Sequence, residues 1–214
     1  MTTVATPSVK ERLLASAQRL FSQSGYNAVS MRAIAKEADA NVGSLTYHFG
    51  SKASLLREIY MRHTAPMNQR RGELLEQAVL LKDDDERLRF VLRAYILPAF
   101  SMSENSVGGG AEFTRMRAVL SAEGNKDASA IIAESFDETS HAFMRAIADC
   151  VPGASQEGLL WCSQFLLGSL YYALINPERI TRLSGGEVDG HDRDAAIDAL
   201  VNASFASFRN LSSR

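Results

Sequence analysis

Residues 30–52, SMRAIAKEADANVGSLTYHFGSK, constrain the fold more than any other part of the chain. Small and apolar residues recur at helical spacing on both sides of the three-residue break Asp39-Ala40-Asn41. We expect one short helix to begin after Ser30 and a second to span residues 42–49, where Gly50 closes it. Two short helices joined by so brief a turn are typical of a helix-turn-helix.

A helix-turn-helix requires small side chains where its two helices cross. Ala33, Ala35 and Ala38 supply such side chains in the first helix. In the second helix, Leu45 and Phe49 lie one turn apart and are expected to face inward. The opposite face of the second helix would then be free to enter the major groove of DNA, which is about 12 Å wide.

The helical pattern continues on both sides of this motif. A first helix is expected to end at Gly25, because glycine tolerates the left-handed conformation of a helix C-cap. A fourth helix is expected to begin at Lys52, capped by Ser51, and Pro66 is expected to end or kink it. Residues 1–63 are therefore predicted to form an N-terminal helix-turn-helix domain.

The remainder of the chain, residues 64–214, is predicted to form a C-terminal helical bundle, which makes the fold class all-α. Strand-type alternation is nowhere sustained, and only five prolines interrupt the helical pattern. Loops are expected at residues 101–110, which contain three successive glycines, and at residues 184–190. Further helices are expected over residues 67–81, 84–100, 111–122, 126–150, 155–176 and 192–210.

The net charge of −2 conceals an asymmetry along the chain. Residues 1–63 contain eight basic and four acidic side chains, a net charge of +4, and the remainder carries −6. Positive charge gathered in the helix-turn-helix domain favours phosphate binding, because only charges near a duplex release counterions. Small helical domains also reach this charge by chance, so charge alone does not decide the function.

Several classes of protein are disfavoured by the sequence. Cys150 and Cys162 form neither a CxxC motif nor a cluster with histidines, which disfavours a zinc site and a disulfide scaffold. No phosphate loop, dinucleotide-binding pattern or nucleophile elbow is found. No apolar run approaches the ~18–20 residues that span a bilayer, and the first residues lack the apolar core of a signal peptide. We therefore expect a cytoplasmic protein with no membrane partner, no metal and no cofactor.

One spacing suggests a metal enzyme. Glu138-x-x-His141 matches the pair that a di-iron carboxylate bundle uses, and Glu134 lies one turn before it. Such a site needs a second Glu-x-x-His and two further glutamates, and the four histidines of the chain supply no second pair. A solvated helix face explains these three residues better.

The segment from residue 8 to about residue 60 resembles the DNA-binding domain of TetR-type transcriptional regulators. That family joins a helix with an Ile-Ala-x-x-Ala pattern to a recognition helix that ends in an aromatic-rich Tyr-x-Phe-x-x-Lys-x-x-Leu pattern. The chain departs from the family at Asp39, where glycine is common, at Val42 and at Thr46. Aspartate tolerates the left-handed conformation that glycine would adopt there. The residues that match in order and spacing are Ile34-Ala35, Ala38, Gly43-Ser44-Leu45, Tyr47-His48-Phe49, Ser51-Lys52 and Leu55-Leu56.

The resemblance implies which residues meet DNA. Ser30 and Arg32 would lie near phosphates at the start of the second helix, and Lys52 would reach the DNA backbone from the start of the fourth. Alternatives remain open for three residues: Tyr47 as a partly buried prop, His48 as a solvated helix end and Lys52 as an ordinary surface lysine. The residues expected to line the groove are Val42, Gly43, Ser44, Thr46, Tyr47 and His48.

The resemblance also implies a homodimer with an effector pocket in its C-terminal body. Residues 155–176 fit a buried or interface helix, because their apolar side chains spread over more than one face. Residues 192–210 present small side chains that a second copy could approach closely, although an intramolecular core explains both helices about as well. Core packing is likewise the alternative for every pocket candidate. The candidates are Phe113, Met116, Phe143, Met144, Trp161, Phe165 and Tyr172.

The sequence thus predicts a DNA-binding transcriptional regulator rather than an enzyme. In this family such a protein is most often a repressor, released from a pseudo-palindromic operator on double-stranded DNA by a small effector. The mixture of aromatic residues and methionines favours an apolar or amphipathic effector. The alternative is a small-molecule-binding helical enzyme with a vestigial DNA-binding domain, and salt-dependent binding to duplex DNA distinguishes the two.

Overall fold

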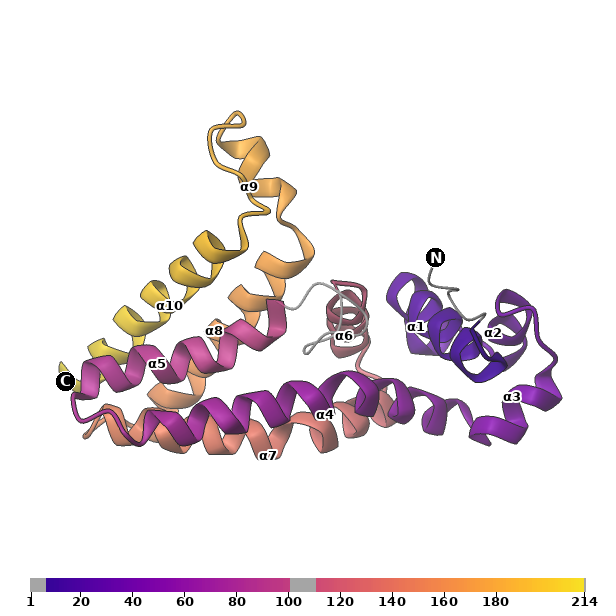
Figure 1. Cartoon of the computed structure of the whole chain (residues 1–214), viewed down its shortest axis with the longest axis horizontal. Coiled ribbons are helices and arrows are strands. Elements are labelled where there is room, and N and C mark those ends of the chain that lie inside the picture. The colour runs from indigo at the N-terminus through magenta and orange to yellow at the C-terminus, as the bar shows by residue number, and fades with distance from the viewer. Residues whose placement is uncertain (1–6, 101–110, 214) are drawn as a thin grey trace, which may run out of the picture. The chain divides into compact units, whose positions relative to one another are not determined.

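The computed structural model describes residues 7–100 and 111–213, and every regular element in these ranges is helical (Figure 1). The all-α fold class predicted from the sequence is confirmed. The loop expected at residues 101–110 lies outside the described residues. The helices are α1 (Val9–Ala28), α2 (Met31–Glu37), α3 (Val42–Phe49), α4 (Lys52–Ala78), α5 (Asp84–Ile96), α6 (Ala111–Glu123), α7 (Lys126–Cys150), α8 (Gln156–Ile175), α9 (Glu178–Leu183) and α10 (Arg193–Arg209), with 3-10 turns at Leu97–Phe100 and Asn210–Ser213.

The chain divides into two compact units. The first unit comprises residues 1–65 and 115–135, and the second comprises residues 66–114 and 136–214. Helices α4, α6 and α7 each begin in one unit and end in the other. The unit that contains the helix-turn-helix therefore also contains the end of α6 and the beginning of α7, which no sequence pattern indicates.

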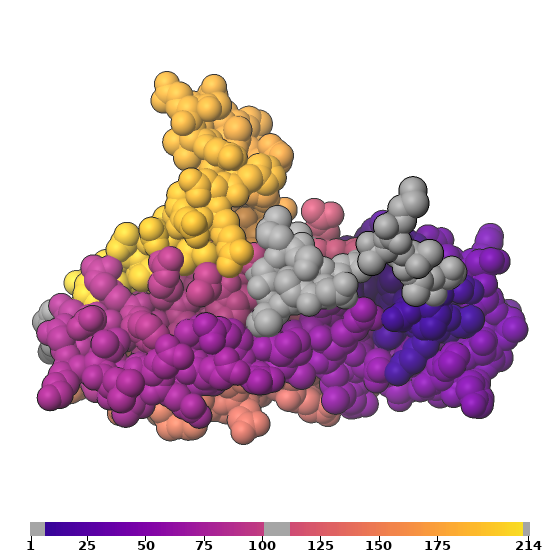
Figure 2. Space-filling model, viewed as in Figure 1, coloured from indigo at the N-terminus to yellow at the C-terminus, as the bar shows by residue number. Residues whose placement is uncertain are grey.

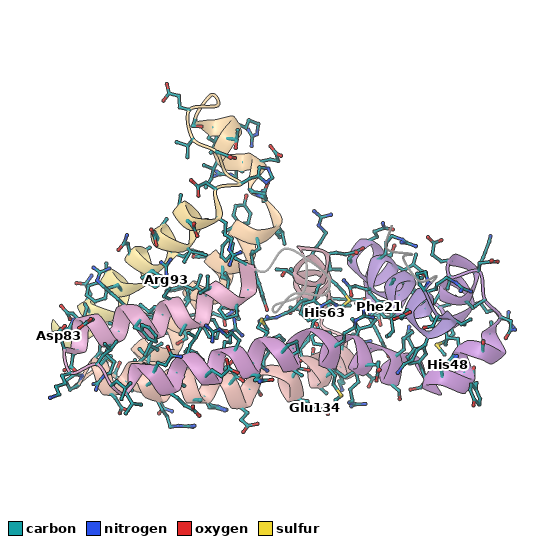
Figure 3. The ribbon with its side chains drawn as sticks, viewed as in Figure 1. Phe21, His48, His63, Asp83, Arg93 and Glu134 are labelled. Atoms are coloured by element: carbon teal, nitrogen blue, oxygen red, sulfur yellow. The ribbon has the colours of Figure 1, made fainter. Side chains whose placement is uncertain are left out.

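In the first unit, α1, α2, α3 and the start of α4 pack around a small apolar core. Each helix contributes a fully buried side chain: Phe21, Ile34, Leu45 and Leu55 (Figure 3 labels Phe21). The helical conformation of α1 is interrupted at Gly25, whose φ is 77°, before one last turn. The break expected at this glycine is therefore found, although the helix resumes beyond it.

Helix α4 differs from the prediction. Pro66 does not end it, because α4 runs from Lys52 to Ala78 and includes most of the pattern expected over residues 67–81. A proline inside a helix removes one backbone hydrogen bond, a local cost that buried neighbours such as Met67 can offset. The six-residue α9 was also not predicted. It is too short for a periodic pattern, and no side chain caps its start.

In the second unit, α10 packs against α5 and α8. Asp83 caps the start of α5 (Figure 3). Arg89 of α5 donates a hydrogen bond to Asn202 of α10 and lies 3.8 Å from the ring centre of Phe205. Helix α9 and the turn that follows it project from one end of this unit (Figure 2), and no residue of α9 is buried.

Helix α8 carries an extensive exposed apolar surface. By length and composition it could cross a membrane, with a mean hydropathy of 1.4, contrary to the expectation that no segment approaches this length. Its buried side chains are only Cys162, Leu166 and Leu170. One such helix is a weak indication of a membrane span, because core and interface helices can be equally apolar.

Candidate DNA-binding interface

Side-chain caps define where the two helices of the motif begin. Ser30 Oγ accepts a hydrogen bond from the backbone N–H of Ala33 at 3.1 Å, and Asn41 Oδ1 accepts one from the N–H of Ser44 at 2.7 Å. These oxygens satisfy backbone donors that have no partner within the helix. Both helices therefore begin where the sequence predicts.

The turn between the helices depends on Asp39. It is the one non-glycine residue with a positive φ, 48°, among the described residues. The backbone N–H of Ala40 donates to the carbonyl of Ala35 at 2.9 Å and closes the turn. From α1, Arg12 Nε donates to the carbonyl of Ala38 at 3.1 Å. Arg12 was not among the predicted site residues, because nothing in the local sequence shows that α1 reaches the turn.

Helix α3 has one anchored face and one free face. Leu45 and Phe49 are buried, as predicted. Tyr47 is 85% exposed, which excludes its interpretation as a buried prop. The ring of His48 lies 5.3 Å from that of Tyr47, centre to centre, at the solvent-exposed end of the helix (Figure 3). The other outward residues are Val42, Gly43 and Thr46, which are exposed, and Ser44, which is half-buried.

The small residues of α2 and of its C-cap, Ala38, do not all serve the helix crossing. Ala35 and Ala38 are buried, whereas Ala33 is exposed, so its assignment to the crossing is wrong. Ala33 and Ala35 are two positions apart, and in a helix such residues lie on different faces. Ala33 lies instead on the exposed side of α2, next to Arg32. Ser30 and Arg32 are both exposed at the start of α2, where the resemblance implies phosphate contacts.

Lys52 has partners within the protein. Its ammonium donates to the backbone carbonyls of Tyr26 at 2.8 Å and Val29 at 2.9 Å, and lies 4.2 Å from the centre of the Tyr26 ring. Burial lowers the pKa of this ammonium, and the nearby carboxylates of Glu123 and Asp127 act in the opposite direction. Lys52 is thus neither an ordinary surface lysine nor an ammonium held out in solvent. A phosphate contact through its remaining N–H stays a prediction.

A pocket of about 330 Å³ lies in the second unit between α7, α8 and the end of α5. Among the seven predicted ligand-binding residues, Phe143 and Met144 line it. Tyr95 of α5 meets Phe143 there, with the ring centres 5.2 Å apart. Tyr95 and the polar lining residues were not predicted, because they come from α5, α7 and α8 and only the folded chain brings them together. The polar lining residues are Asp137, Ser140, His141, Ser163 and Gln164.

The other five candidates lie outside this pocket. Phe113 and Met116 of α6 are buried side chains. Trp161 and Phe165 stack on each other at the surface of α8, with their ring centres 5.8 Å apart, and Tyr172 is exposed further along the same helix. These three aromatic residues, Trp161, Phe165 and Tyr172, are called the α8 face below.

The residues of the possible di-iron pattern have other surroundings. Glu134 accepts a hydrogen bond from Arg57 Nε at 3.1 Å (Figure 3 labels Glu134), and His141 borders the pocket. Within residues 7–100 and 111–213, no group of three or more His, Cys, Asp or Glu side chains could hold a metal ion. The described part of the chain therefore offers no second ligand pair for such a centre.

The sequence matches two family models. One, described as "Bacterial regulatory proteins, tetR family", matches residues 13–59, and the other, described as "Tetracyclin repressor-like, C-terminal domain", matches residues 93–206. The HTH-type transcriptional regulator UidR of Escherichia coli (strain K12) is 37% identical over 62 residues, 29% of this chain. The match spans 31% of UidR, less than a third of that relative.

Solved structures resemble the whole chain. A TetR-like transcriptional regulator from Rhodococcus sp. RHA1 has a TM-score of 0.56 at 21% identity, with coverage of 98% of this chain and 100% of its own. The transcriptional regulator FadR from Bacillus subtilis, solved in complex with stearoyl-CoA, has a TM-score of 0.52 at 14% identity, with coverage of 92% and 97%. At these identities the likeness shows the fold alone.

A capped helix-turn-helix with an exposed second helix, in a chain that also contains a helical body, is the arrangement of DNA-binding regulators of transcription. One family model covers the motif and the other covers more than half of the chain. The protein belongs to the TetR family of bacterial transcriptional regulators.

Proposed function

We propose that this regulator binds a pseudo-palindromic operator as a homodimer and represses transcription until a small molecule releases it. The division of α3 into an anchored face and a free face carries the proposal: Leu45 is fully buried while Tyr47 is 85% exposed. A short helix held in this way behind a tight turn is suited to enter the major groove. The DNA-binding domain would comprise residues 1–63, and residues 64–214 would form the body.

The free face of α3 offers several kinds of contact. The hydroxyl groups of Ser44, Thr46 and Tyr47 can reach phosphates and base edges, and Val42 can touch a thymine methyl group. Gly43 has no side chain to hold the backbone away from DNA. Ser30 and Arg32 at the start of α2 and His48 at the end of α3 complete the proposed interface, with Lys52 as a secondary phosphate contact.

The α8 face supports a homodimer. Trp161, Phe165 and Tyr172 each expose half or more of their surface, and Ala199 and Ala203 of α10 are exposed small residues. Packing against a second copy would bury this apolar surface in a self-complementary interface. It would also account for the hydropathy of α8 without a membrane. A dimer would place two recognition helices about 34–36 Å apart, or a multiple of this distance. A protein that acts on DNA in this way would work in the bacterial cytoplasm.

The pocket between α7 and α8 is the proposed effector site. Phe143, Met144 and Tyr95 give it an apolar lining and Asp137 and His141 a polar rim, which suits an amphipathic molecule. The complex of FadR with stearoyl-CoA supports the same class of ligand for a protein of this fold. A hundredfold release from DNA requires a coupling free energy of about 2.7 kcal/mol between the two sites.

Selection from a randomised duplex pool tests the proposal. The purified protein should enrich one inverted repeat, and its affinity for that repeat should fall steeply as salt is raised. If the folded, effector-free protein enriches no motif and turns over a compound that is added to it, a helical enzyme with a vestigial DNA-binding domain would instead be favoured. Native mass spectrometry of the same sample shows whether an effector is already bound.

A further inference from the structure

The end of α1 is held by a carboxylate from α6. Glu123, the last residue of α6, accepts hydrogen bonds from the backbone N–H groups of Tyr26 and Asn27, each at 2.7 Å. The first bond ends on Oε2 and the second on Oε1, so both carboxylate oxygens are used. Hydrogen bonds to an ionised group are among the strongest that a protein makes.

Gly25 makes this approach possible. Its φ of 77° is a conformation that residues with a side chain rarely adopt, and it directs the next two N–H groups toward Glu123. A Cβ atom at residue 25 would lie 3.0 Å from Glu123 Oε1 and 3.1 Å from its Cδ. The conformation of Gly25 and its missing side chain therefore both serve the contact with Glu123.

The last turn of α1 and its C-cap Val29 are bonded from two directions. We call residues 26–29 the α1–α2 linker. Glu123 binds its N–H groups, and Lys52 binds its carbonyls at Tyr26 and Val29. Asn125 adds a bond from its side-chain amide to Asn27 Oδ1 at 2.6 Å. The linker leads directly to Ser30, the cap of α2. The position of the linker therefore determines the position in space of the first turn of α2.

We propose that Glu123 is a positioning residue for DNA recognition, which holds the α1–α2 linker and thereby the start of α2 in the orientation that DNA binding requires. This inference rests on the proposed DNA interface of α2 and α3. A linker fixed before binding loses less conformational freedom when DNA is bound. Glu123, at the end of α6, thus helps to present the recognition helix, although the sequence around it carries no DNA-binding motif.

The variant Glu123→Gln separates positioning from charge. It keeps the shape of the side chain but leaves one acceptor oxygen for two N–H donors. Loss of a negative charge by itself should strengthen binding to DNA, whereas loss of positioning should weaken it. We expect the Kd for the selected duplex to rise about tenfold at every salt concentration, with an unchanged salt slope. Amide exchange at Tyr26 and Asn27 should become faster.

Glu134→Gln is the matched control. It removes the same charge from the same segment of the first unit, but its partner is the exposed side chain of Arg57, and it should bind DNA within twofold of the wild type. Ile59→Val, a small deletion in the core of this unit, should lower thermal stability and leave the Kd unchanged.

Four results would overturn the proposal. One is wild-type affinity in Glu123→Gln together with faster amide exchange, and another is an equal loss of affinity in Glu134→Gln. Unchanged amide exchange at Tyr26 and Asn27 would show that the contact itself contributes nothing in solution. A wild-type protein that enriches no duplex would reject the DNA interface, and the positioning role with it.

Discussion

The ammonium of Lys52 lies 2.8 Å from the backbone carbonyl oxygen of Tyr26 and 4.2 Å from the centre of its ring. A basic residue at the start of the fourth helix of a DNA-binding domain would be expected to face phosphates. Here it binds the carbonyls at the end of α1, where the negative end of the helix dipole favours a cation. Lys52 therefore contributes mainly to the stability of the first unit.

Lys52→Ala should accordingly lower the stability of the protein and leave the salt dependence of DNA binding nearly unchanged. We expect a loss of about 1–2 kcal/mol in the free energy of unfolding, measured in urea, because two carbonyls lose a charged donor. Lys36→Ala, which removes an exposed ammonium from α2, should change stability by less than about 0.5 kcal/mol. A salt slope that falls by about 0.9 in Lys52→Ala would show that the ammonium also neutralises a phosphate.

Tyr47→Ala should weaken binding to the selected duplex by about tenfold without loss of stability, because the side chain contributes almost nothing to the core. Tyr47→Phe would separate the hydroxyl contribution from that of the ring. Leu80→Ala, at an equally exposed position in the second unit, provides the comparison and should bind DNA like the wild type. Equal affinities for Tyr47→Ala and the wild type would remove this residue from the interface.

His63 predicts a dependence of stability on pH. Its Nε2 lies 2.7 Å from Gln18 Oε1 in the core of the first unit, and burial lowers the pKa of the imidazole to about 4. The unfolded chain takes up this proton near pH 6.5, whereas the folded chain does not until about pH 4. The contribution of His63 to stability should therefore be constant above pH 6.5 and should be lost as the pH decreases to 4, by about 3 kcal/mol at most.

Urea unfolding of the wild type and His63→Gln between pH 7.5 and pH 4 checks this dependence. The variant removes the titrating imidazole and leaves the carboxylates unchanged, so the difference between the two proteins isolates His63. That difference should shrink as the medium is acidified from pH 6.5. A difference independent of pH over this range would show that the folded protein accommodates the imidazolium.

Phe165→Glu should disrupt the proposed dimer. The substitution places a charge in the centre of the α8 face, and sedimentation should then show a monomer whose affinity for the inverted repeat is about a hundredfold lower. Val79→Glu, at an exposed position near the end of α4, introduces the same charge away from this face and should remain dimeric. A dimer that survives Phe165→Glu would move the interface elsewhere.

Local signals in the sequence predict the helix-turn-helix closely. Ser30 and Asn41 cap the two helices, Gly50 ends the second, and Asp39 adopts the left-handed conformation that the turn requires. Each of these features involves residues no more than four positions apart. The alternation of buried and exposed positions in α3 follows from the same short-range geometry, which is why its outer face could be assigned from the sequence.

Features that depend on distant parts of the chain could not be predicted. Arg12 reaches a turn 26 residues away, and Glu123 binds backbone groups 97 and 96 residues away. No spacing or composition signals such contacts. The continuation of α4 through Pro66 and the exposure of Ala33 likewise depend on which neighbours are buried, and this is a property of the folded chain.

The spacing of the two half-sites in the selected inverted repeat tests the central claim most directly. A dimer with two recognition helices requires both to meet the same side of the duplex, so inserting five base pairs between the half-sites turns one of them away. We predict that this insertion lowers affinity about a hundredfold and that insertion of a full turn of ten or eleven base pairs restores part of it. Equal affinity for all three spacings would contradict a dimer that reads both half-sites at once.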